Sequence, residues 1–163
     1  MSDTKNDYPL LAKQLESLLS GERNWLTNIS QFAALVFNNL NQINWAGFYL
    51  KVDDNYLKLG AFQGQVACTT IKIGTGVCGT SAEQRESLLV KDVDQFKGHI
   101  VCDSRSRSEL VCPVIVDNEL WGVFDLDSPI LSRFDKQDQQ GVEELINVLI
   151  RSTDWNVGIG HLN

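Results

Sequence analysis

The pattern that most constrains the fold of this chain is a pair of apolar runs separated by a short polar turn. Leu110–Val116 and Leu120–Leu126 are largely apolar, and Asp117-Asn118-Glu119 joins them. Such runs around a turn rich in Asp and Asn predict a β-hairpin. Parallel strands need a crossover of a dozen or more residues, so this connection predicts an antiparallel sheet.

A second hairpin and several helical repeats extend this prediction to an α+β fold. Trp45–Lys51 and Tyr56–Phe62 flank the turn 53–55, and shorter strands are expected near Thr69–Ile73 and Leu88–Lys91. Helices are expected over the leucines of 11–19, the apolar stripe 25–40, Val77–Glu86, and the segment that follows a capping Asp135. Consecutive hairpins with terminal helices predict a central antiparallel sheet with the helices on one side.

Charge and composition exclude several classes of partner. The 163 residues carry a net charge of −7, which repels nucleic-acid phosphates and anionic lipid surfaces. No apolar stretch approaches the roughly 20 residues needed to span a bilayer, and the polar N-terminus does not resemble a signal peptide. We therefore expect a cytoplasmic protein that binds neither nucleic acid nor membranes.

The chain has four cysteines, and their surroundings differ. A reducing compartment disfavours a static disulfide framework, which leaves metal binding, redox catalysis or core packing. Cys102 lies in the polar segment 98–109, where a free thiol indicates either a functional group or a half-buried space filler. Neighbouring His99, Arg105 and Arg107 are able to lower its pKa, if they point toward it. The remaining cysteines are Cys68, Cys78 and Cys112.

A zinc site built from Cys68, Cys78, Cys102 and His99 is disfavoured. Structural zinc sites usually contain a Cys-x-x-Cys pair, and this sequence contains none. We expect no metal.

Three carboxylates are expected to converge at one end of the predicted sheet. Asp125 and Asp127 are two residues apart on a strand and therefore share a face, and Glu109 should lie opposite them in the hairpin. Adjacent carboxylates repel each other when buried, unless an ammonium, a metal or a shared proton relieves the repulsion. The alternative interpretation is that Asp125 and Asp127 lie at the end of a strand and face water.

Two further features are candidates for a site. Cys78 follows Gly74-Thr75-Gly76 at the start of a predicted helix, where the positive helix end favours a thiolate. Trp45 and Tyr49 share one face of a strand and are able to form a pocket wall, although core packing explains such aromatic residues equally well.

Taken as a set, these motifs resemble the free methionine-(R)-sulfoxide reductases. The resemblance runs in unbroken order from about Leu15 to Trp155. Its motifs are Asn44–Leu50, Phe62-Gln63-Gly64 with Ala67-Cys68, Gly76–Gly79, the 98–109 segment, Asp125–Ser128 and Arg133-Phe134. It implies a single GAF domain over residues 1–163, with a core at about 15–155, which agrees with the α+β prediction.

The resemblance also implies a role for each site residue. Cys102 would be the nucleophile, Cys68 the main resolving cysteine and Cys78 an auxiliary one, whereas Cys112 matches no cysteine of the family and is expected in the core. Trp45 and Tyr49 would enclose the methyl and thioether end of the substrate. Glu109, Asp125 and Asp127 would bind its amino group and polarise the sulfoxide oxygen.

The implied reaction needs no organic cofactor. Free methionine sulfoxide would be the substrate, thioredoxin the external reductant, and the assembly a homodimer. Two alternatives remain open from the sequence: a GAF module that only binds a small ligand, and a cysteine redox sensor without substrate turnover.

Overall fold

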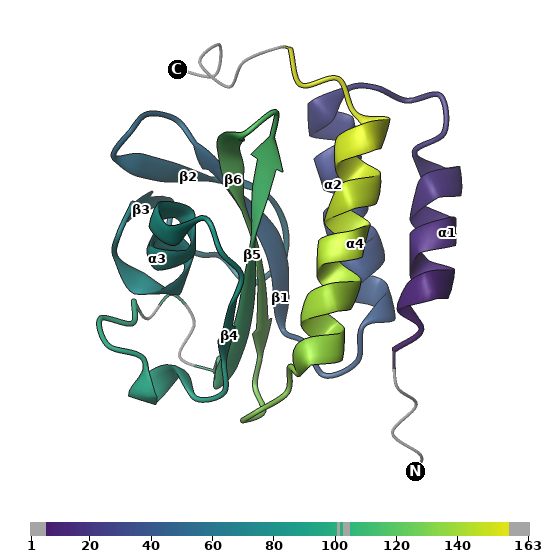
Figure 1. Cartoon of the computed structure of the whole chain (residues 1–163). Helices are drawn as coiled ribbons and strands as arrows, with labels where there is room; N and C mark the ends of the chain where they lie inside the picture. The colour runs from purple at the N-terminus through teal and green to yellow at the C-terminus, as the bar shows by residue number, and fades with distance from the viewer. Residues whose placement is uncertain (1–5, 101, 103–104, 157–163) are drawn as a thin grey trace.

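The computed structural model describes residues 6–100, 102 and 105–156, which form one curled antiparallel sheet and its helices (Figure 1). The strand order is β3-β2-β1-β6-β5-β4. The strands are β1 (Trp45–Lys51), β2 (Tyr56–Gly64), β3 (Thr70–Lys72), β4 (Leu88–Val90), β5 (Ser108–Val116) and β6 (Glu119–Ser128). The helices are α1 (Tyr8–Leu18), α2 (Trp25–Asn39), α3 (Gly76–Gln84) and α4 (Lys136–Ser152), with a short 3₁₀ helix at Val93–Gln95.

Both predicted hairpins are confirmed. β5 pairs with β6 and β1 pairs with β2, in each case antiparallel. The β5–β6 turn contains Asp117 and Asn118 with φ of 51° and 65°, and such left-handed pairs favour Asn and Asp in two-residue hairpin loops. β1 also pairs with β6, which brings the two hairpins together at the centre of the sheet.

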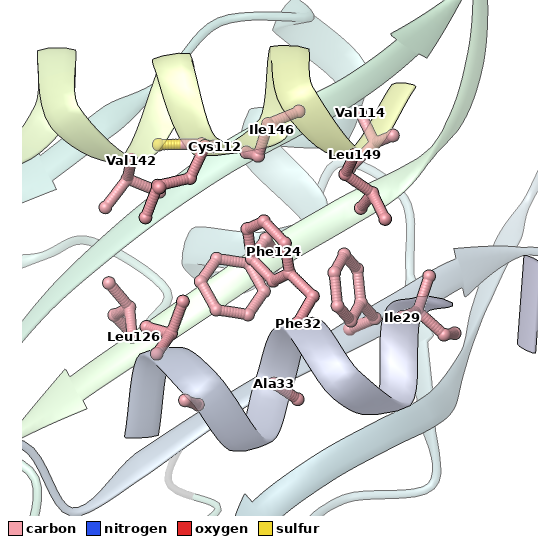
Figure 2. Close-up of a cluster of buried hydrophobic side chains, with 14 of the residues drawn as sticks. Ile29, Phe32, Ala33, Cys112, Val114, Phe124, Leu126, Val142, Ile146 and Leu149 are labelled. Atoms are coloured by element: carbon pink, nitrogen blue, oxygen red, sulfur yellow. The ribbon is translucent and has the colours of Figure 1, made fainter. Parts of the chain in front are cut away.

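The larger core lies between the sheet and helices α2 and α4, and α1 packs on α4 on the side away from the sheet (Figure 1). Phe32 of α2 packs edge-to-face on Phe124 of β6, with ring centroids 4.8 Å apart. Cys112 lies among the apolar side chains between β5 and α4 (Figure 2) and is fully buried. The prediction that Cys112 is a core residue is confirmed.

The expectation that all helices lie on one side of the sheet is wrong for α3. This helix packs on the opposite face, where Val77, Cys78 and Ala82 meet Val111 and Val123. The reason is topological: β3 and β4 are at opposite edges of the sheet, and α3 lies in their connection. That connection crosses the face that the other helices leave open.

The last helix begins as predicted at Asp135. Its carboxylate accepts a hydrogen bond from the backbone N–H of Asp138, and the Asp138 carboxylate accepts one from the N–H of Asp135. This reciprocal capping box satisfies two backbone donors at the helix start. Within the described residues, no helix combines the length and apolar character needed to cross a membrane.

Candidate active site

A pocket opens on the α3 face of the sheet, and it has an empty volume of about 530 Å³ including the part open to solvent. Strands β1, β5 and β6 form its floor, and α3 borders it together with His99, Ile100, Cys102 and Ser106. Seven of the eight site residues predicted from the sequence line it: Trp45, Tyr49, Cys78, Cys102, Glu109, Asp125 and Asp127. The eighth, Cys68, is joined to Cys102 by a disulfide.

Strand register explains how the three carboxylates meet. Glu109 lies directly opposite Asp127 in the β5–β6 pair, and Asp125 is two residues before Asp127 on the same face. Glu109 and Asp125 are only 6% and 5% exposed. The alternative that these strand ends face water is therefore wrong for Glu109 and Asp125, and Asp127 is half-buried.

Burial and mutual repulsion keep protons in this carboxylate cluster. Burial, followed by the charges of Asp125 and Asp127, raises the pKa of Glu109 well above its usual range. Burial also raises the pKa of Asp125 to about 6, although hydrogen bonds from Glu109 and Cys78 oppose that rise. Within the described part of the chain, Asp125 Oδ1 is buried without a hydrogen-bond partner. The cluster can therefore supply both a proton donor and an acceptor for a cationic group.

Cys78 joins this cluster but is not the thiolate that its place at a helix start predicted. Its Sγ lies 3.9 Å from Glu109 Oε1. Burial raises the pKa of the thiol well above its ordinary value, and the charges of Asp125, Glu109 and Asp127 add to that rise. These effects outweigh the helix end, so Cys78 is a protonated thiol at neutral pH.

Cys68 and Cys102 form a disulfide with Cα atoms 5.4 Å apart, although 34 residues separate them in the chain. Because neither has a free thiol here, the influence of His99, Arg105 and Arg107 on the pKa of Cys102 stays a prediction. The imidazole Nε2 of His99 lies 3.9 Å from Glu109 Oε2. Burial lowers the pKa of His99 and the charge of Asp94 partly offsets this, so the imidazole is mainly neutral at pH 7.

The aromatic wall stands on β1. The Trp45 and Tyr49 rings stack with centroids 5.8 Å apart, and the Phe62 ring also stacks on Trp45, with centroids 5.4 Å apart. Trp45 Nε1 donates a hydrogen bond to the carbonyl of Gln65, and the Tyr49 hydroxyl donates one to the carbonyl of Cys68, each at 3.0 Å. No sequence pattern predicted these two bonds.

Sequence reasoning also missed several residues of the pocket lining. Gly76 has a φ of 63°, and a Cβ at this position would lie 3.1 Å from the side chain of Ile100. The sequence predicts a helix that begins just after Gly76, and the structure makes Gly76 the first residue of α3, but the close approach of Ile100 has no local signal. The other missed residues are Val66, Ala67, Ile71, Thr75, Val77 and Ser106.

One group of side chains has the composition of a cation site. Potential ligand atoms of Cys78, Glu109 and Asp125 all lie within 4.8 Å of one another. This set differs from the zinc site of Cys68, Cys78, Cys102 and His99 that the sequence disfavours. Of those residues, Cys68 and Cys102 are joined in the disulfide. An ammonium group fits the same acidic surroundings, because its three N–H donors match carboxylate acceptors.

Fold and site together define a GAF-domain protein: the family model for the GAF domain matches residues 23–150. Free methionine-R-sulfoxide reductase of Escherichia coli strain K12 is 42% identical over 151 residues, which cover 91% of each chain. The reduced form of fRMsr from Staphylococcus aureus has a TM-score of 0.88 at 44% identity, covering 93% of this chain and 98% of that one. Free methionine-R-sulfoxide reductase from Neisseria meningitidis, solved in complex with its substrate, has a TM-score of 0.87 at 38% identity, covering 93% and 91%. This chain therefore belongs to the GAF-domain family of free methionine-R-sulfoxide reductases.

Proposed function

We propose that this protein reduces free L-methionine (R)-S-oxide to L-methionine. The observation that carries the proposal is the juxtaposition of a cysteine pair able to form a disulfide with buried carboxylates in one pocket. The names of the relatives supply the substrate. A pocket of this kind suits a small zwitterion that carries an oxidised sulfur.

The carboxylates and the aromatic wall would bind opposite ends of the substrate. The ammonium group would take the place of a proton in the cluster of Glu109, Asp125 and Asp127, where Asp125 Oδ1 has no partner among the described residues. The methyl and thioether end would lie against Trp45 and Tyr49, whose stacked rings offer an apolar surface.

The first chemical step would use Cys102 as the nucleophile. Its thiolate attacks the sulfoxide sulfur while a protonated carboxyl group, Glu109 or Asp127, donates a proton to the sulfoxide oxygen. Methionine leaves with its sulfur reduced by two electrons, and Cys102 retains the oxygen as a sulfenic acid. The raised pKa of Glu109 supports the presence of such an acid at neutral pH.

Recycling would then proceed through thiols. Cys68 attacks the sulfenic sulfur and water leaves, and thioredoxin reduces the Cys68–Cys102 disulfide by exchange. Cys78, buried beside Glu109, would take part only in a later exchange. The proposal includes a cytoplasmic homodimer and needs no organic cofactor.

One assay separates this proposal from its two alternatives. Purified protein is mixed with thioredoxin, thioredoxin reductase, NADPH and free methionine sulfoxide, and NADPH oxidation and methionine are measured together. The proposal requires both, in equal amounts. A ligand-binding GAF module would bind a small molecule without oxidising NADPH, and a redox sensor would form its disulfide with peroxide without releasing methionine.

A further inference from the structure

The loop that carries Cys68 is held by the two aromatic side chains of the pocket wall. This loop, residues 65–69, connects β2 to β3. Trp45 donates to the carbonyl of Gln65 at its start, and Tyr49 donates to the carbonyl of Cys68 near its end, each at 3.0 Å. Both aromatic residues belong to β1 at the centre of the sheet, so the loop is tied to a rigid element.

Other contacts hold the two ends of the loop and leave its middle exposed. A Cβ on Gly64, whose φ is 122°, would lie 2.7 Å from the Trp45 ring, so the chain passes close to that ring as it enters the loop. At the exit, Leu59 N–H donates to the Thr69 carbonyl at 3.0 Å. Between them Val66 is 85% exposed. Within the part of the chain that the structure describes, the Tyr49 hydroxyl is the hydrogen-bond partner that reaches the main chain of Cys68.

The Tyr49 hydroxyl is a permanent donor. Burial raises the pKa of this phenol far above its ordinary value, and the charge of Asp125 adds to the effect. The hydroxyl therefore stays protonated at every pH at which a thiol enzyme works, and the bond to Cys68 does not depend on pH.

We infer that Tyr49 is a positioning residue for the resolving cysteine: its hydroxyl fixes the main chain of Cys68 within reach of Cys102. This inference rests on the proposed function, and it gives Tyr49 a role beyond that of its ring in the pocket wall. In the resolving step the Cys68 sulfur bonds to the Cys102 sulfur, the S–O bond of the sulfenic acid breaks, and the oxygen leaves as water with the thiol proton.

The resolving step, in which Cys68 attacks the sulfenic acid of Cys102, is sensitive to small movements of the loop that carries Cys68. The two Cα atoms are 5.4 Å apart, and cysteines separated by more than about 7 Å cannot be bridged without backbone movement. A loop that drifts by a few ångströms therefore spends much of its time out of reach, which lowers the effective concentration of one thiol at the other.

The first test measures this effective concentration without any methionine sulfoxide. Reduced protein is equilibrated with oxidised glutathione, which converts the two protein thiols to the disulfide and yields two reduced glutathione molecules. Tyr49→Phe keeps the ring and removes the donor, and we expect about a tenfold lower effective concentration. A tenfold change equals about 1.4 kcal/mol, the size expected for loss of one hydrogen bond. Tyr56→Phe on the exposed side of β2 is the matched control and should match the wild type.

The second test compares two rates in a single turnover. Methionine release reports the attack by Cys102, and disulfide formation, quenched by alkylation and read by mass spectrometry, reports the attack by Cys68. In Tyr49→Phe the rate of disulfide formation should fall at least about fivefold more than the rate of methionine release. When Cys68 is already replaced by Ser, adding Tyr49→Phe should not alter the lifetime of the Cys102 sulfenic acid, because the Cys68 thiol that Tyr49 positions is absent.

The outcomes distinguish this inference from the proposed function. An unchanged glutathione equilibrium in Tyr49→Phe would overturn the positioning role, whether or not the protein turns over methionine sulfoxide. So would equal slowing of both rates, since that result assigns Tyr49 to substrate binding alone. A tenfold shift in the equilibrium without any turnover would support the positioning role and reject the reductase.

Discussion

Replacement of Asp125 by Asn should weaken the protein's discrimination between free and N-acetylated methionine sulfoxide. The change keeps the size of the side chain and removes a charge from a residue that is 5% exposed. Acetylation removes the positive charge of the substrate amino group with little added bulk. The substitution removes the negative partner of the proposed ammonium–carboxylate contact, and acetylation removes the positive partner.

The magnitude follows from the burial of this contact. Removing one partner of a buried charge pair typically costs about 3–5 kcal/mol, which corresponds to a factor of hundreds to thousands in affinity. Glu109 and Cys78 hydrogen-bond to the Asp125 carboxylate, but its Oδ1 has no hydrogen-bond partner among the described residues, so none of them replaces the ammonium at that oxygen. With about 3 kcal/mol as the lower bound, kcat/KM of the wild type should be at least about a hundredfold lower for the acetylated substrate.

The assay is kcat/KM for both substrates with thioredoxin, its reductase and NADPH. In Asp125→Asn we expect a large loss of kcat/KM for the free amino acid and a smaller loss for the acetylated compound. The ratio of the two kcat/KM values should therefore be smaller than in the wild type. Asp54→Asn, whose side chain is 96% exposed, is the matched control and should keep the wild-type ratio. If the wild type reduces both substrates equally fast, the carboxylates do not bind the ammonium, and their role is confined to proton transfer or structure.

Three further predictions concern the cysteines and the pH dependence of stability. Cys102→Ser should abolish turnover, whereas Cys112→Ser, a change in the buried core between β5 and α4, should leave it nearly intact; similar losses in steady-state assays would remove Cys102 as the nucleophile. Cys68→Ser should still release about one methionine per chain in a single turnover but cycle poorly with thioredoxin; full cycling, or the absence of a Cys68–Cys102 bridge in peptide maps of the oxidised wild type, would contradict this scheme. Because burial raises the pKa of Asp125 from 3.8 to about 6, the folded state holds more protons than the unfolded state between these values, and the free energy of unfolding should fall as the pH rises through about 6. The loss attributable to Asp125 is up to about 3 kcal/mol, so urea unfolding of Asp125→Asn from pH 4 to 7.5 should show a smaller fall, and an equal fall would argue against the raised pKa.

Much of the fold follows from local sequence because its strands are joined by short turns. The turn at Asp117 and Asn118 starts the pairing of β5 with β6 at Val116 and Glu119, and an irregularity between Val114 and Ile115 then shifts the register by one residue, so that Glu109 lies opposite Asp127. The core position of Cys112 follows from the alternation of the same strand. The hairpin and the position of Cys112 depend on residues close together in the chain, where side-chain period and turn chemistry leave few alternatives, whereas the one-residue shift that brings Glu109 opposite Asp127 is seen only in the folded hairpin.

Other features depend on segments that meet only in the folded chain. The face on which α3 packs follows from the positions of β3 and β4 at opposite edges of the sheet. The protonated state of Cys78 follows from burial among carboxylates of β5 and β6, which outweighs the helix end that the sequence made visible. The bond from Tyr49 to the Cys68 carbonyl joins β1 to a loop 19 residues later, and neither residue carries a local signal of the other. Local sequence determined which side chains share a strand face, whereas desolvation and long-range contacts, which exist only after folding, decided which of them carry protons and which hold one another in place.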